Sequence, residues 1–180
     1  MQRISRLALI GFGQDAKTML EMGLNRHNRV ITAFDFNTLE PTMRRDLLAD
    51  YIHHNVQGCI SLQDAIRGTH LIFLLDNEKH ISDKHKKDEI ALIKNLIKHI
   101  KNEQIVLDLT SRNLDEKTAI EAEIKTKDAT YLIGQLMPSA QQDTHLIISH
   151  QAAEIRKYFE SLNLRVDIIK NDPLTENNEI

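Results

Sequence analysis

Cysteine, net charge and long apolar runs are all scarce in this sequence of 180 residues. Cys59 is the single cysteine, which excludes an intramolecular disulfide and a cysteine-rich metal site. The formal charge of −3 at pH 7 supplies no basic field that would attract nucleic acid. No apolar stretch approaches the ~20 residues needed to cross a bilayer, and the first residues lead into structure instead of a cleavage site. We therefore expect a cytoplasmic protein that binds neither nucleic acid nor a membrane.

Motifs of several catalytic and metal-binding classes are missing as well. The sequence contains no G-x-S-x-G elbow and no G-x-x-x-x-G-K-[ST] phosphate loop. His80 and His85 are five residues apart, not the three or four that place two ligands on one helical face. We therefore expect surface histidines and no metal site. Cys59 stands before Ile60 in a short apolar stretch, which favours a buried thiol over a nucleophile.

Short apolar runs alternate along the chain with segments of helical spacing. In the clearest helical segment, 86–101, Ile90, Ile93 and Ile97 fall on one stripe. The pattern predicts strands at 7–10, 30–34, 71–75, 105–109, 131–133, 146–149 and 165–169, and helices at 16–26, 41–53, 61–67, 86–101, 114–125 and 151–162. This alternation predicts an α/β protein of the Rossmann type, with a doubly wound, mainly parallel sheet and helices on both faces. We expect one domain over 1–170 and a polar tail at 171–180.

Two glycines follow the first predicted strand and precede a helix, in the stretch LALIGFGQDAKTM. This is the setting of a dinucleotide-binding turn, in which Gly11 permits the tight turn and Gly13 lets the backbone approach a pyrophosphate. Ala16 supplies the third small residue, which allows close helix packing. Asp15, in the first helical turn, would repel the pyrophosphate and weaken its binding.

An acidic residue ends the second predicted strand, RVITAFD. Asp35 follows Ala16 by nineteen residues, the spacing at which a carboxylate accepts hydrogen bonds from an adenosine ribose. An aspartate after a strand is also a common turn former, so both interpretations stay open. Its negative charge favours NAD over NADP, unless Arg44 and Arg45 fold over the adenosine.

Several segments resemble the β-hydroxyacid dehydrogenases, a family that includes 3-hydroxyisobutyrate dehydrogenase and phosphogluconate dehydrogenase. The resemblance lies in IGFGQDAKTM, SLQDAIRGTHLIFLLDN, VLDLTSRNLDEKTAIEAEI, DATYLIGQLMPSA and HLIISHQAAEIRKYFESLNLRVDII. It implies the cofactor domain of an oxidoreductase that uses NAD or NADP.

The resemblance also assigns residues to the cofactor. They are Gly11, Phe12, Gly13, Gln14 and Asp15 in the pyrophosphate loop, Asp35 at the ribose, Leu75, Asp76 and Asn77 beyond the fourth strand of the family, and Thr110 and Ser111 near the nicotinamide. The family usually has proline where Asp76 stands. Structural alternatives remain for Asn77, as a turn residue, and for Thr110 and Ser111, as caps of the following helix.

Two departures from the family bear on catalysis. Pro138, Ser139 and Ala140 stand where the family has a serine and two glycines for the substrate carboxylate. The sequence also ends at Ile180, about where the helical domain with the family's proton-transfer lysine would begin. No catalytic residue is therefore assigned, and we expect a homodimer or a further catalytic domain to complete the site. A non-catalytic module for dinucleotide sensing or dimerisation is the alternative.

Overall fold

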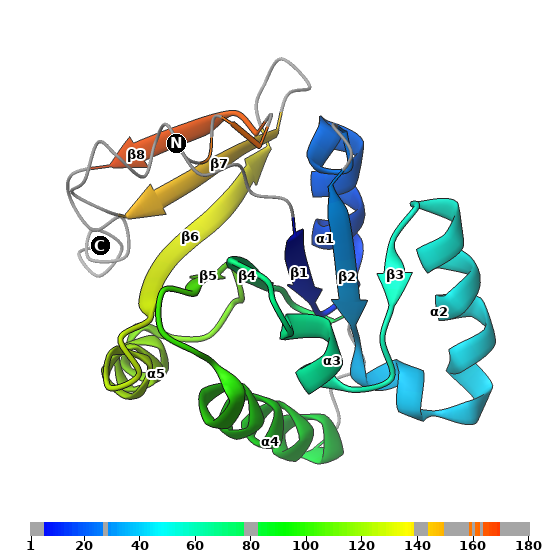
Figure 1. The fold of residues 1–180 in the computed structure, drawn as a ribbon, viewed down its shortest axis with the longest axis horizontal. Coiled ribbons are helices and arrows are strands. Elements are labelled where there is room, and N and C mark those ends of the chain that lie inside the picture. The colour runs from blue at the N-terminus through cyan, green and yellow to red at the C-terminus, as the bar shows by residue number, and fades with distance from the viewer. Residues whose placement is uncertain are drawn as a thin grey trace, which may run out of the picture.

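An eight-stranded sheet organises the computed structural model, which describes residues 6–26, 29–77, 83–138, 144–149, 159, 161–162 and 164–169. Its strands are β1 (Arg6–Ile10), β2 (Val30–Phe34), β3 (Gln57–Gly58), β4 (Leu71–Leu74), β5 (Ile105–Asp108), β6 (Thr130–Pro138), β7 (Thr144–Ser149) and β8 (Val166–Ile169). The strand order is β3-β2-β1-β4-β5-β6-β7-β8 (Figure 1). Every neighbouring pair is parallel except β6 with β7. The order reverses between β1 and β4, which is where ligands bind in open parallel sheets.

Helices connect the parallel strands from β1 to β6, and local sequence signals mark where several of them begin. They are α1 (Gln14–Met19), the π-helical η1 (Leu20–Leu24), the 3₁₀ helix η2 (Phe36–Leu39), α2 (Pro41–His53), α3 (Leu62–Ile66), α4 (Asp83–His99) and α5 (Leu114–Lys125). Pro41 opens α2, where its missing N–H costs nothing. Ser61 caps α3 by accepting a hydrogen bond from Asp64 N, and Asn113 forms a capping box with Glu116 at the start of α5.

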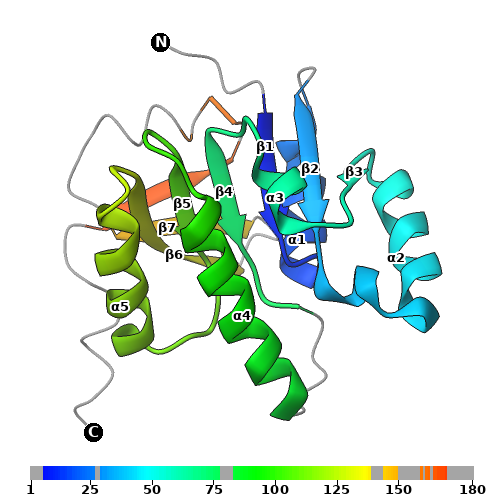
Figure 2. The same cartoon turned by 60° about the horizontal axis from the view of Figure 1, so that its bottom comes forward.

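Two apolar cores lie on opposite faces of the sheet. Side chains alternate along β1, so Leu7 and Leu9 join one core while Ala8 and Ile10 join the other. The first core includes the apolar side of α1 and η1, and the second includes those of α3, α4 and α5, which lie together in front of the sheet in Figure 2. The predicted Rossmann-type fold with helices on both faces is therefore confirmed.

The predicted elements differ from the structure at a few places. β3 was not predicted, because two residues are too short to show a pattern. The first helix is interrupted at Gly23, whose φ of 107° lies outside the helical region. The predicted helix 151–162 and the polar tail 171–180 fall on residues that the structure describes only at 159, 161 and 162. None of the helices in the described ranges is long and apolar enough to cross a membrane.

Candidate functional site

The glycine turn lies at the switch point between β1 and β4. Gly11 has a φ of 94°, and its N–H donates to the Phe34 carbonyl at 2.9 Å. A Cβ atom at Gly11 would lie 2.3 Å from the Leu75 carbonyl oxygen and 3.2 Å from Asn77 Oδ1. The turn and the segment after β4 are thus packed backbone to backbone, and only glycine fits at position 11. This contact brings together Gly11, Leu75 and Asn77, which are three of the predicted site residues.

Asp35 lies beneath this turn instead of at the surface. Its Oδ2 accepts a hydrogen bond from Phe12 N at 2.8 Å and its Oδ1 accepts one from Asn37 N at 2.8 Å. The residue is 2% exposed. The turn-forming interpretation of Asp35 is therefore present in the structure, and its contact with a ribose stays a prediction.

The start of α1 presents backbone donors toward the same edge of the sheet. Gly13 is the N-cap residue, with φ −86° and ψ −159°, and no side chain of the described residues caps this helix. Phe12 is buried and packs edge-to-face on Tyr51, with ring centroids 4.7 Å apart, while Gln14 is exposed. Amide groups at an uncapped helix start favour an anion, although Asp15 adds a negative charge in the same turn.

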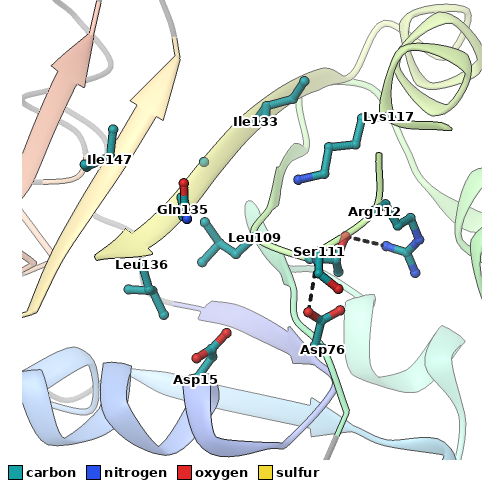
Figure 3. A pocket seen from close by; sticks show the side chains of 12 residues that line it. Asp15, Asp76, Leu109, Ser111, Arg112, Lys117, Ile133, Gln135, Leu136 and Ile147 are labelled. Atoms are coloured by element: carbon teal, nitrogen blue, oxygen red, sulfur yellow. Dashed lines mark hydrogen bonds between the residues drawn. The ribbon is translucent and has the colours of Figure 1, made fainter. Parts of the chain in front are cut away.

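A cavity of about 300 Å³ opens beside Asp15 of α1, at the carboxyl end of β5 and along the middle of β6 (Figure 3). Its described lining is Asp15, Asp76, Leu109, Thr110, Ser111, Arg112, Lys117, Ile133, Gly134, Gln135, Leu136 and Ile147. Four of the predicted site residues line it: Asp15, Asp76, Thr110 and Ser111. Its volume is at the lower end for ligand pockets, enough for a ring-sized group.

Acidic groups gather at the cavity wall formed by α1 and the loop after β4. Asp76 Oδ2 accepts a hydrogen bond from Ser111 N at 2.9 Å. Burial raises the pKa of the Asp15 carboxyl, and the neighbouring charge of Asp76 raises it further. Two carboxyl groups thus lie close enough on this side of the cavity to influence each other electrostatically.

A buried carboxylate organises the opposite wall. Asp108, which is fully buried, accepts hydrogen bonds from Thr110 N at 2.8 Å, from the Thr110 hydroxyl and from the Tyr131 hydroxyl at 2.6 Å. It also pairs with Arg112 Nη1 at 3.6 Å and with Lys117 Nζ at 3.9 Å. Burial and the Asp108 charge raise the pKa of Tyr131, which keeps its hydroxyl a donor.

This arrangement corrects one alternative from the sequence. Asn113, not Thr110 or Ser111, caps α5. Thr110 instead bonds Asp108 and accepts a hydrogen bond from Arg112 Nη1 at 2.9 Å, so it belongs to the wall of the cavity. The competing interpretation of Thr110 and Ser111 as helix caps is wrong, because the helix starts at residue 114.

Sequence reasoning missed three polar residues of the cavity: Arg112, Lys117 and Gln135. One signal was present for Lys117, which shares a helical stripe with the buried Ile120 and Ile124. A lysine among buried positions is unusual without a partner. Nothing comparable in the sequence marks Gln135, whose place depends on the pairing of β6 with β7.

Metal-ligating residue types and Cys59 can be located among the described residues. No group of three or more metal-ligating side chains occurs among the described residues. Cys59 is buried, and its burial and Asp64 raise the pKa of the thiol, so it is a poor nucleophile. The altered loop at Pro138, Ser139 and Ala140 falls outside the described residues, apart from the strand backbone at Pro138.

Comparison with solved structures identifies proteins of the same fold. A conserved hypothetical protein from Sinorhizobium meliloti matches with a TM-score of 0.72 and 19% identity, over 92% of this chain and 54% of that one. The 3-hydroxyisobutyrate dehydrogenase from Mycobacterium tuberculosis, solved with L-serine, matches with a TM-score of 0.66 and 11% identity, over 92% and 54%. An imine reductase from Myxococcus stipitatus in complex with NADP+ matches with a TM-score of 0.65 and 17% identity, over 91% and 54%.

These matches confirm the family resemblance at the level of the fold. The chain spans about half the length of the structures it matches. No protein-family model matches the sequence, and no curated protein sequence matches it significantly.

Proposed function

We propose that this chain binds a nicotinamide dinucleotide and serves as the cofactor domain of an oxidoreductase. The observation that carries the proposal is the Gly11 turn at the switch point, packed against Leu75 and followed by a helix whose Asp15 lines a cavity. The backbone of Gly13 and of the start of α1 would hold the pyrophosphate, and the cavity would hold the nicotinamide end. When bound, the cofactor supplies hydride transfer. A helical domain or a second copy of the chain would complete the substrate site.

The structure gives a reason to favour NADP over the NAD expected from Asp35. The Asp35 carboxylate is buried and bonded to backbone N–H groups, so it presents little charge to a 2′-phosphate. Arg44 is exposed, and its Nε donates to the Thr38 carbonyl at 2.8 Å, which places the guanidinium beside the segment that follows β2. An arginine at this end of the site is the usual receptor of the 2′-phosphate. Solved structures of the same fold include complexes with NADP+ and NADPH.

Isothermal titration calorimetry with NADP+ and NAD+ tests this function. We expect NADP+ to bind more tightly than NAD+. Arg44→Met should weaken NADP+ binding about tenfold, because the 2′-phosphate loses one charged hydrogen-bonding partner, and should leave NAD+ binding unchanged. Arg45→Met, on the next exposed position of α2, is the matched control and should leave both affinities unchanged. If neither NADP+ nor NAD+ bound, the proposed function would be refuted. Equal losses in the two variants would refute the role of Arg44.

Asp15 should oppose dinucleotide binding. Asp15→Asn is expected to tighten NADP+ binding roughly fivefold, because it removes about 1 kcal/mol of repulsion between like charges. The raised pKa of Asp15 sets the direction of the pH dependence. As the pH falls through this pKa, the carboxyl becomes neutral and the affinity of the wild-type protein for NADP+ rises. The rise should be smaller in Asp15→Asn. Asp46→Asn, on the exposed side of α2, is the control for net charge. An unchanged affinity in Asp15→Asn would place the pyrophosphate elsewhere.

A further inference from the structure

Lys117 is an almost completely buried lysine that reaches the cavity from the first turns of α5. The residue is 3% exposed, and its side chain runs from the stripe of Ile120 and Ile124 into the space near Leu109 and Gln135, as Figure 3 shows. Ordering and desolvating a lysine is costly, so lysine is rarely buried without a full set of partners.

The partners of this amine are incomplete. Its ion pair with Asp108 Oδ1 spans 3.9 Å, which is longer than a hydrogen bond. The Asp108 oxygens already accept hydrogen bonds from Thr110 and Tyr131, and Arg112 shares the same negative charge. Within the described part of the chain, Nζ makes no hydrogen bond. Toward the described residues, the amine therefore has hydrogen-bonding capacity left, and it faces the cavity.

The surroundings of Lys117 lower the pKa of its amine below the ordinary value for lysine. Burial lowers the pKa of Lys117, and the charge of Arg112 lowers it further, whereas Asp108 and Asp76 oppose the shift without reversing it. Leu109, Ile133, Leu136 and Ile147 supply apolar parts of the cavity wall. A desolvated lysine beside a second cation is an arrangement that activates the amine as a nucleophile toward carbonyl groups.

We propose that Lys117 forms an imine with a small neutral carbonyl compound that enters this cavity. The lone pair of the neutral amine adds to the carbonyl carbon, the carbonyl oxygen leaves as water with the two amine hydrogens, and a C=N bond replaces the C=O bond. Asp15 and Asp76 at the wall disfavour carbonyl compounds that carry a carboxylate. This activity goes beyond dinucleotide binding and requires no nucleotide.

Reductive trapping on the full chain tests the proposal. The protein is incubated at pH 7 with propanal and cyanoborohydride, without nucleotide, and peptide mapping by mass spectrometry follows alkylation of each lysine. We expect Lys117 to be alkylated at least about tenfold faster than Lys125, because it is an activated amine. Lys125 is the internal reference, in the last turn of the same helix, with a side chain 66% exposed and paired with Glu121. Alkylation of Lys117 no faster than that of Lys125 would overturn the proposal.

A variant and a second probe sharpen the result. Lys117→Arg keeps a basic side chain beside Asp108 and cannot form this imine, so no fast lysine should remain while the Lys125 rate stays the same. Another lysine that is alkylated as fast in this variant would overturn the assignment. With pyruvate in place of propanal, the ratio of Lys117 to Lys125 alkylation should fall, and an equal or higher ratio would refute the preference for neutral compounds. Calorimetry with NADP+ is independent of trapping, so each proposal can fail separately.

Discussion

Gly11→Ala is expected to lower the free energy of unfolding by about 2–5 kcal/mol. The left-handed φ of 94° is strained for alanine, and the new methyl group would lie 2.3 Å from the Leu75 carbonyl oxygen, so the backbone after β4 must shift. Both segments belong to the core of the sheet, where such a shift disturbs close packing. Urea unfolding followed by circular dichroism measures the change.

Gly68→Ala separates backbone strain from the steric clash at Gly11. Gly68 also has a positive φ, 66°, but no atom lies within 4 Å of its added Cβ. This variant should therefore lose only about 1–2 kcal/mol, the cost of alanine in a left-handed conformation. If Gly11→Ala were no less stable than Gly68→Ala, the turn would not be packed against the segment after β4 as described.

Asp108→Ala is expected to cost about 3–5 kcal/mol of stability, since removing one partner of a buried ion pair leaves uncompensated charge. Arg112 and Lys117 would lose their shared carboxylate, and the Tyr131 hydroxyl would lose its acceptor. Thermal and urea unfolding measure the loss. The cavity wall formed by Thr110 should also loosen, because Thr110 is bonded to Asp108 through both its N–H and its hydroxyl.

Two control variants test that explanation. Asp115→Ala, at an exposed position in the first turn of α5, should cost less than about 1 kcal/mol, the value of a charge near a helix terminus. Asp108→Asn keeps the shape of the side chain without its charge. Its loss of stability should lie between those of Asp108→Ala and Asp115→Ala. An Asp108→Ala protein as stable as Asp115→Ala would show that the buried network contributes little.

The elements of the fold could be read from the sequence because their signals are local. The apolar runs at 7–10 and 71–75 and the helical stripe at 86–101 reflect periodicities between near neighbours, and periodicity distinguishes a buried strand from an amphipathic helix. The glycine turn was predicted for the same reason, since strand, glycine and helix follow one another directly. The two-residue β3 carries no such pattern and was missed.

The direction of side chains near the ends of the elements was decided by tertiary contacts. The sequence predicts the position of Asp35 at the end of β2. It does not predict that the Asp35 carboxylate accepts a hydrogen bond from Phe12 N, 23 residues away in the sequence. Thr110 is likewise a residue type that often caps helices. In the structure, its N–H and its hydroxyl donate hydrogen bonds to Asp108, and Asn113 caps the helix. Both choices depend on which donors the folded chain brings close to a buried carboxylate.

By itself, the sequence determined an α/β sheet with a glycine turn after its first strand, because these features are set by neighbouring residues. Only the tertiary structure decided that Asp15, Asp76 and Lys117 face one cavity. These residues lie on α1, on the loop after β4 and on α5, and they meet because parallel pairing brings the carboxyl ends of β1, β4 and β5 to one edge of the sheet. Parallel pairing joins segments far apart in sequence, so no local pattern records which side chains will share a site or which charges will shift one another's pKa.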